Sequence, residues 1–157
     1  MGAQNRIVVT LDSVLESVEL AEEVALKFAL AAGFDEEDLH KLGMAVREGV
    51  INALQYGNKM SPEKKARLTL ESFPDKLEVR ILDQGEGFSL ADVPDPLAEE
   101  NLLKSSGRGI LLMRSFMDEF DVRPGTEGGA ELVMAMRRPS RESDRSAGSA
   151  QAKEDGK

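Results

Sequence analysis

The amino-acid sequence predicts an α+β domain, because two long helix-like segments stand among several strand-like segments. Residues 14–32 and 35–58 carry apolar side chains at spacings of three and four, the pattern of amphipathic helices. The strand-like segments are short and either rich in β-branched residues or alternate apolar with polar side chains. They span residues 6–11, 66–73, 76–82, 119–123 and 130–137.

Composition and charge exclude several classes of site and partner. The chain has 157 residues, enough for one domain with a core, and a formal net charge of −9, which disfavours nucleic acid as a partner. Without Cys and with a single His, the chain has no thiolate or His-rich metal site, so any metal is expected to be a hard ion such as Mg²⁺. No apolar run approaches the roughly 20 residues of a membrane span, so we expect a cytoplasmic protein without membrane contact.

The first predicted helix, 14–32, follows the N-terminal strand, with Asp12 or Ser13 as its expected cap and Gly33 at its end. Its apolar positions recur like a heptad seam, which would suit a partner helix. Packing against the domain's own sheet explains the same pattern, and we favour it. These positions are Val14, Val18, Ala21, Ala25, Phe28 and Ala32.

The second predicted helix begins at Asp35 and carries Glu48 and Asn52 four residues apart, on one face. The residues around this pair are apolar or small, so at least one of the two polar side chains should be buried and should meet a polar partner. An exposed Glu followed by an Asn near the helix end is the alternative. His40, the only histidine, is expected at the surface.

Strands 66–73 and 76–82 should form an antiparallel hairpin that runs directly into Asp83, Gly85 and Gly87. An aspartate at a strand end can accept a hydrogen bond from an amino group. The two glycines allow a planar ring or a phosphate to approach the backbone closely. Asp and Gly also make ordinary turns, so this motif alone leaves both interpretations open.

Residues 89–106 form a long connection of the kind that often serves as a lid. Gly107, Arg108 and Gly109 then open an apolar helix, where free backbone N–H groups and an arginine could bind an anion; a simple hinge is the alternative. The last two strands follow. The composition then shifts to polar residues, so we expect a domain over 1–137 and a disordered tail over 138–157.

Taken together, Glu-x-x-x-Asn on a helix, Asp-x-Gly-x-Gly after a strand and Gly-x-Gly at a helix start resemble the motifs of the GHKL ATPase superfamily. The resemblance covers most of residues 5–137 and is closest to the anti-sigma regulatory factors, which are bacterial serine-protein kinases. It implies the Bergerat ATP-binding fold: a two-layer α+β sandwich in which helices cover one face of a mixed, mostly antiparallel sheet.

The resemblance also implies roles for individual residues in binding ATP and Mg²⁺. Asn52 would bind the metal, Glu48 would orient or deprotonate the attacking hydroxyl, and Asp83 would accept from the adenine amine. The remaining nucleotide contacts would come from Gly85, Gly87, Ser106, Gly107, Arg108, Gly109 and Ile110. The family commonly has a Gly-Thr pair where this chain has Gly129 and Ala130, so Thr126 or a water would have to replace that hydroxyl.

The implied function is an ATP-dependent serine/threonine-protein kinase that acts as an anti-sigma factor. It would form a homodimer, bind a sigma factor and phosphorylate an anti-anti-sigma (STAS) protein. A histidine kinase would need a phosphoacceptor histidine on a preceding hairpin, and a gyrase-like ATPase would need a second domain. The main alternative is a non-catalytic nucleotide-binding module that sequesters a transcription regulator, and Glu48 favours the kinase.

Overall fold

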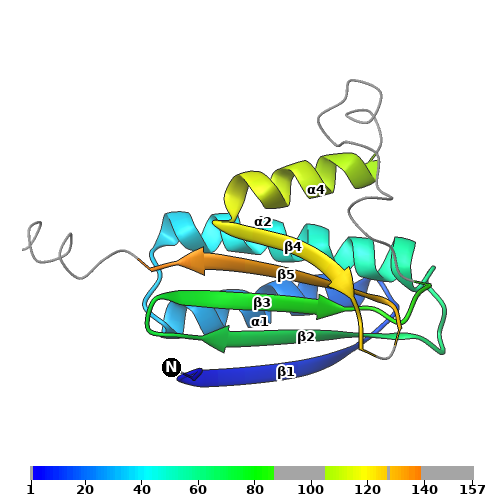
Figure 1. The fold of residues 1–157 in the computed structure, drawn as a ribbon, viewed down its shortest axis with the longest axis horizontal. Coiled ribbons are helices and arrows are strands. Elements are labelled where there is room, and N and C mark those ends of the chain that lie inside the picture. The colour runs from blue at the N-terminus through cyan, green and yellow to red at the C-terminus, as the bar shows by residue number, and fades with distance from the viewer. Residues whose placement is uncertain (1, 87–104, 127, 139–157) are drawn as a thin grey trace, which may run out of the picture.

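The computed structural model describes residues 2–86, 105–126 and 128–138, so most of the predicted lid and tail lie outside the described residues. It contains a five-stranded sheet of order β1-β2-β3-β5-β4 (Figure 1). Every pairing between these strands is antiparallel, so the sheet has none of the expected mixed character. The strands are β1 (Asn5–Asp12), β2 (Lys65–Ser72), β3 (Lys76–Leu82), β4 (Glu119–Pro124) and β5 (Ala130–Arg137).

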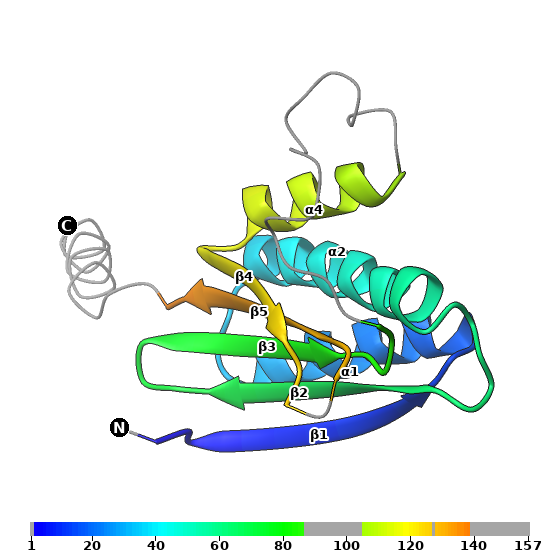
Figure 2. The ribbon, with the colours of Figure 1, turned by 45° about the vertical axis from the view of Figure 1, so that its right-hand side comes forward.

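The helices form the second layer. Figures 1 and 2 show α1 (Glu16–Ala31) and α2 (Glu36–Asn52) side by side on one face of the sheet. α2 continues into a short π-helix, η1 (Ala53–Gly57). The third helix, α4 (Ser105–Phe116), packs against α2 beside β4. The prediction of a two-layer α+β sandwich is confirmed.

The core lies between the sheet and the two long helices, and it is almost entirely aliphatic. Val18, Ala21, Ala25 and Phe28 of α1 are buried in it, which confirms that this seam packs within the domain rather than on a partner helix. Val14 was wrongly assigned to the seam: it precedes α1 and is 44% exposed.

Helix α2 begins with a side-chain cap, whereas helix α1 does not. At α2, Asp35 Oδ1 accepts a hydrogen bond from Asp38 N at 2.9 Å, so the predicted cap is confirmed. At α1, neither Asp12 nor Ser13 caps the helix, because Leu15 occupies the N-cap position without a side-chain hydrogen bond. The Ser13 hydroxyl instead donates to Lys64 O at 2.6 Å, so a tertiary contact takes the place of the expected cap.

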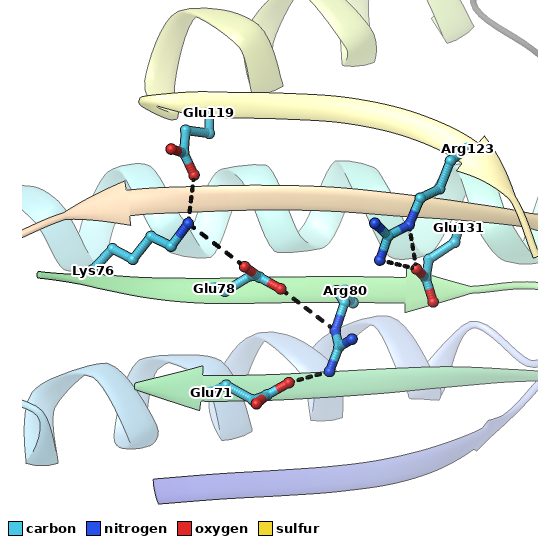
Figure 3. Close-up of polar contacts among 7 residues, drawn as sticks. All are labelled: Glu71, Lys76, Glu78, Arg80, Glu119, Arg123 and Glu131. Atoms are coloured by element: carbon cyan, nitrogen blue, oxygen red, sulfur yellow. Dashed lines mark hydrogen bonds and ion pairs between the residues drawn. The ribbon is translucent and has the colours of Figure 1, made fainter. Parts of the chain in front are cut away.

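The face of the sheet away from the helices carries a network of ion pairs (Figure 3). Lys76 Nζ lies 3.0 Å from Glu119 and 3.8 Å from Glu78. Arg80 joins Glu78 to Glu71 on the neighbouring strand. Opposite charges on adjacent strands compensate one another in water, so this polar face leaves the sheet with a single buried side.

Two further predictions concern the surface. His40 is exposed, as expected. Within the part of the chain that the structure describes, no helix is both long and apolar enough to cross a bilayer.

Candidate functional site

Glu48 and Asn52 lie one turn apart on α2, and both are half-buried. The glycine between them brings this helix close to the sheet. A β-carbon on Gly49 would lie 2.7 Å from Ile81 Cδ1 and 2.8 Å from Leu132 Cδ2. A side chain at position 49 would therefore require Ile81 and Leu132 to shift or α2 to move away from the sheet.

Gly109 of α4 faces this pair. A β-carbon on Gly109 would lie 2.9 Å from Glu48 Oε2, and 3.5 Å and 3.7 Å from the amide nitrogen and oxygen of Asn52. Two motifs more than 50 residues apart in the chain therefore meet at this point. The prediction was that at least one of Glu48 and Asn52 is buried beside a polar partner. Both are half-buried, and they lie next to one another and to Gly109.

The glycine-rich motif opens α4, as the sequence predicted, and lies inside the helix. α4 begins at Ser105, so Ser106, Gly107 and Arg108 belong to its first turn. Packing against α2 overrides the weak helix propensity of the glycines. The backbone N–H groups of a first helical turn lack intrahelical acceptors, so an anion can still bind there. Arg108 is exposed and Ile110 is buried.

Asp83 is buried at the end of β3, with 6% of its surface exposed. Its Oδ1 accepts hydrogen bonds from Gly85 N at 2.9 Å and Ala130 N at 3.0 Å. Its own N–H donates to Ala130 O at 3.0 Å. These contacts fix the carboxylate between the β3 end and the start of β5.

Three glycines surround this carboxylate, and each leaves no room for a β-carbon. A β-carbon added to Gly57 would lie 2.2 Å from Asp83 Oδ2, and one added to Gly85 would lie 2.2 Å from Gly57 O. On Gly129, which has a φ of +74°, it would lie 2.1 Å from Asp83 O. The backbone therefore packs against Asp83 on several sides and fixes its carboxylate in place.

A cavity of about 210 Å³ connects these parts, and Asn52, Asp83 and Ile110 line it. The remaining lining is mainly apolar and includes the rings of Tyr56 and Phe120. An apolar cavity with a few polar groups at fixed places is typical of small-molecule sites. Figure 2 shows α4 beside α2 and above β4, and residues of these elements, β3 and β5 line the cavity.

Two predicted residues remain to be placed, and three residues without a predicted role lie at the site. Gly87 lies outside the described residues, and Thr126 does not line the cavity where Ala130 does. Sequence reasoning gave no role to Gly57, Asn58 or Gly129, which all contact Asp83 or its loop. The available signals were that Gly57 and Asn58 end the segment resembling the first family motif and that Gly129 stands where the family commonly has a Gly-Thr pair.

Few of the side chains described at the site could bind Mg²⁺ directly. Among residues 2–86, 105–126 and 128–138, no three Asp, Glu or His side chains converge into a metal-binding cluster. Mg²⁺ usually keeps several waters and takes only one or two protein ligands together with substrate phosphates. The single amide oxygen of Asn52, beside the cavity, fits a metal held in that way.

An antiparallel two-layer sandwich with this cavity under α2 and α4 defines the class of histidine kinase-like ATPase domains. The family model described as the histidine kinase-like ATPase domain matches residues 11–136. Relatives with curated names include serine-protein kinase RsbW of Staphylococcus epidermidis, 30% identical over 140 residues, covering 85% of this chain and 87% of that protein. The chain therefore belongs to the GHKL superfamily, and within it to the family of the RsbW anti-sigma factors.

Two further relatives are also named serine-protein kinase RsbW. RsbW of Bacillus licheniformis is 31% identical over 108 residues, which cover 65% of this chain and, at 66%, slightly less than two thirds of that protein. RsbW of Listeria innocua is 26% identical over 136 residues, covering 83% of this chain and 85% of that protein.

Two solved structures share the fold. The RsbU and RsbW domains of a Mycobacterium tuberculosis protein match with a TM-score of 0.58 and 17% identity, over 88% of this chain and 34% of that one. The catalytic domain of the histidine kinase ThkA matches with a TM-score of 0.50 and 13% identity, over 83% of this chain and 97% of that one.

Proposed function

We propose that this protein is an ATP-dependent serine/threonine-protein kinase that acts as an anti-sigma factor. It would bind a sigma factor and phosphorylate an anti-anti-sigma protein with a STAS domain, acting as a homodimer in the cytoplasm. The observation that carries this proposal is the placement of Glu48 and Asn52 against Gly109, beside a cavity that also reaches Asp83.

The Asp83 end of the cavity would take the adenine. Asp83 Oδ1 accepts two backbone hydrogen bonds, so Oδ2, on the side of Gly57, would accept from the exocyclic amine. The apolar lining would contact the faces of the purine ring. Gly85 and Gly129 would hold the Asp83 carboxylate in place, and Gly87, outside the described residues, would lie beside the ring.

The α4 end of the cavity would take the phosphates. The backbone N–H groups of the first turn of α4, from Ser106 to Arg108, the helix dipole and the Arg108 guanidinium would stabilise their charge, with Gly109 and Ile110 beside them. Asn52 would hold Mg²⁺ through its amide oxygen, and the ion would neutralise part of the phosphate charge. Phosphoryl transfer depends mainly on positioning and charge stabilisation, and this arrangement provides both.

Glu48 would act as the general base. As the acceptor serine oxygen bonds to the γ-phosphorus, the Glu48 carboxylate would take the hydroxyl proton, and the bond to ADP would break. Gly109 leaves space for the carboxylate at this place, since a β-carbon there would press on Oε2.

Incubation of the protein with Mg-ATP and purified STAS-domain proteins tests the kinase directly. Mass spectrometry should find a phosphoserine or phosphothreonine on one of them, and none in a parallel sample with EDTA. Sigma-factor binding is measured separately by size-exclusion chromatography, with ATP and with ADP. Normal ATP binding without transfer to any cognate STAS protein would contradict the kinase.

The second candidate is a nucleotide-binding module that sequesters a regulator without transferring phosphate. The presence of Ala130 in place of the usual threonine, with Thr126 away from the cavity, favours this candidate. In that case the sigma factor or another regulator would bind in the same assay, and no phosphorylated product would form.

A further inference from the structure

Asn58 lies just beyond η1 and is fully buried, with 0% of its surface exposed. Both ends of its amide are hydrogen-bonded. Oδ1 accepts from Gln84 N at 2.8 Å, and Nδ2 donates to Ser13 Oγ at 3.1 Å. Ser13 in turn donates to Lys64 O, so Asn58 joins the β1–α1 junction to the loop after β3.

The contact with Gln84 bears directly on Asp83, because the Gln84 N–H belongs to the peptide group that follows Asp83. Holding that peptide fixes the direction in which β3 ends and therefore the place of the Asp83 carboxylate. The neighbouring Gly57 adds a second constraint, since its Cα lies against Asp83 Oδ2 and its carbonyl against Gly85. The Gln84 side chain secures the loop from the other side by accepting from Lys65 N at 2.6 Å.

The same segment is continuous with the phosphate end of the cavity. Asn58 N donates to Ala53 O at 2.8 Å, a hydrogen bond that closes the π-helix directly after Asn52. The register of η1 therefore sets the position of Asn58 relative to Asn52. Buried polar groups that are fully satisfied make an arrangement rigid and unique.

We propose that Asn58 is a positioning residue for Asp83, held by Ser13 and acting through the Gln84 peptide and Gly57. It ties the adenine-reading carboxylate to the helix that carries Glu48 and Asn52. The inference rests on the proposed function, because it assumes that Asp83 reads the exocyclic amine of ATP. Asn58 itself does not line the cavity, so it would act on the nucleotide only through Asp83.

The test measures the preference for ATP over an analogue without the 6-amino group, in addition to the affinity for ATP. Dissociation constants for Mg-ATP and for purine riboside triphosphate, which lacks the 6-amino group, are determined by calorimetry. The unaltered protein should prefer ATP by about tenfold or more, the range of one hydrogen bond to a charged group. Asp83→Asn should remove most of this preference, and Asn58→Leu, which has the branched shape of Asn but is larger and cannot hydrogen-bond, should lower it by about fivefold or more.

Two further variants separate positioning from general destabilisation. Asn58→Asp keeps an acceptor for Gln84 N, so it should retain more of the preference than Asn58→Leu. Ser13→Ala removes the support of Asn58 and should also lower the preference. Its matched control is Ser72→Ala, because Ser72 is equally buried but its hydroxyl has no hydrogen-bond partner within the described residues. This control should keep the full preference.

The double variant Asn58→Leu/Asp83→Asn completes the cycle and should lose no more selectivity than Asp83→Asn alone. If Asn58→Leu does not fold, the nucleotide selectivity of Ser13→Ala tests the positioning role in its place. Full selectivity in the folded Asn58 and Ser13 variants, with selectivity lost in Asp83→Asn, would overturn the positioning role alone. Unchanged selectivity in Asp83→Asn would overturn the adenine assignment, and the positioning role with it.

Discussion

The Glu48 carboxylate lies against the backbone of Gly109, so close that a β-carbon on this glycine would come within 2.9 Å of Oε2. The contact joins α2 to α4 at the end of the cavity proposed for the phosphates. Only glycine at position 109 leaves the carboxylate where it is, which links the sequence of one motif to the geometry of the other.

Gly109→Ala should therefore move the Glu48 carboxylate and lower phosphoryl transfer more than ATP binding. A flexible carboxylate can shift by rotation, so we expect a folded protein with transfer reduced by about tenfold or more, within the range contributed by a positioned base. The control is Gly43→Ala in the same helix as Glu48, where the new β-carbon would meet only Leu26 and Glu22 side chains. Equal transfer by both variants in an assay with radiolabelled ATP would contradict the role of the Gly109 contact.

Gly128 and Gly129 offer a matched pair beside Asp83. Both have positive φ, +96° and +74°, so alanine at either position should cost about 1–2 kcal/mol of stability. A β-carbon on Gly128 would have no neighbour within 4 Å, whereas on Gly129 it would collide with Asp83. Gly129→Ala should therefore weaken ATP binding strongly and Gly128→Ala only slightly. Similar affinities of the two variants, measured by calorimetry, would remove the argument that this backbone shapes the adenine site.

Much of this arrangement follows from the sequence where the signals are local. Helical spacing places Glu48 and Asn52 on one face, and alternation places Asp83 at the end of a hairpin strand, as the structure has them. The motif at Gly107 was correctly placed at a helix start, and α4 begins two residues earlier, at Ser105, where packing against α2 stabilises a turn that glycine weakens. The cap at Ser13 was wrong because its partner, Asn58, lies 45 residues away.

The contacts that fix the site join residues that are far apart in the sequence. The hydrogen bond from Gln84 N to Asn58 spans 26 residues, and the approach of Gly109 to Glu48 spans more than 50. Neither periodicity nor propensity carries information about such pairs. The π-helical turn after Asn52 likewise depends on a backbone hydrogen bond that no side-chain pattern indicates.

Arg138 follows β5 and fastens the end of the domain. Its guanidinium donates to Ala32 O and Phe73 O and lies 5.3 Å from the Phe34 ring centre. Arg138→Ala should lower the free energy of unfolding by about 2 kcal/mol, since charged hydrogen bonds and a cation–π contact are lost. Arg137→Ala is the control, because that side chain is exposed and 3.9 Å from Glu119. Urea unfolding measures both variants, and equal losses would contradict the role of Arg138.

Lys76 provides a pH-dependent contribution on the outer sheet face. Its hydrogen bond with Glu119 raises the pKa of Lys76 above the ordinary value of 10.5. The stabilisation should be complete below the ordinary pKa and should disappear as the pH rises through the higher pKa of the folded state. Unfolding midpoints should therefore differ between the unaltered protein and Lys76→Met near pH 8 and converge at strongly alkaline pH. Lys27→Met, at an exposed lysine of α1, should show no such convergence.

The most direct measurement of the central claim compares Mg-ATP binding and phosphoryl transfer to the STAS acceptor in Glu48→Gln. Gln retains the shape of Glu but cannot take a proton, so transfer should fall by about 10²–10⁴-fold while Mg-ATP affinity stays close to that of the unaltered protein. Glu36→Gln, at the start of the same helix, should change neither quantity. Loss of ATP binding together with transfer, or transfer at the full rate in Glu48→Gln, would contradict the assignment of Glu48 as the base of a kinase.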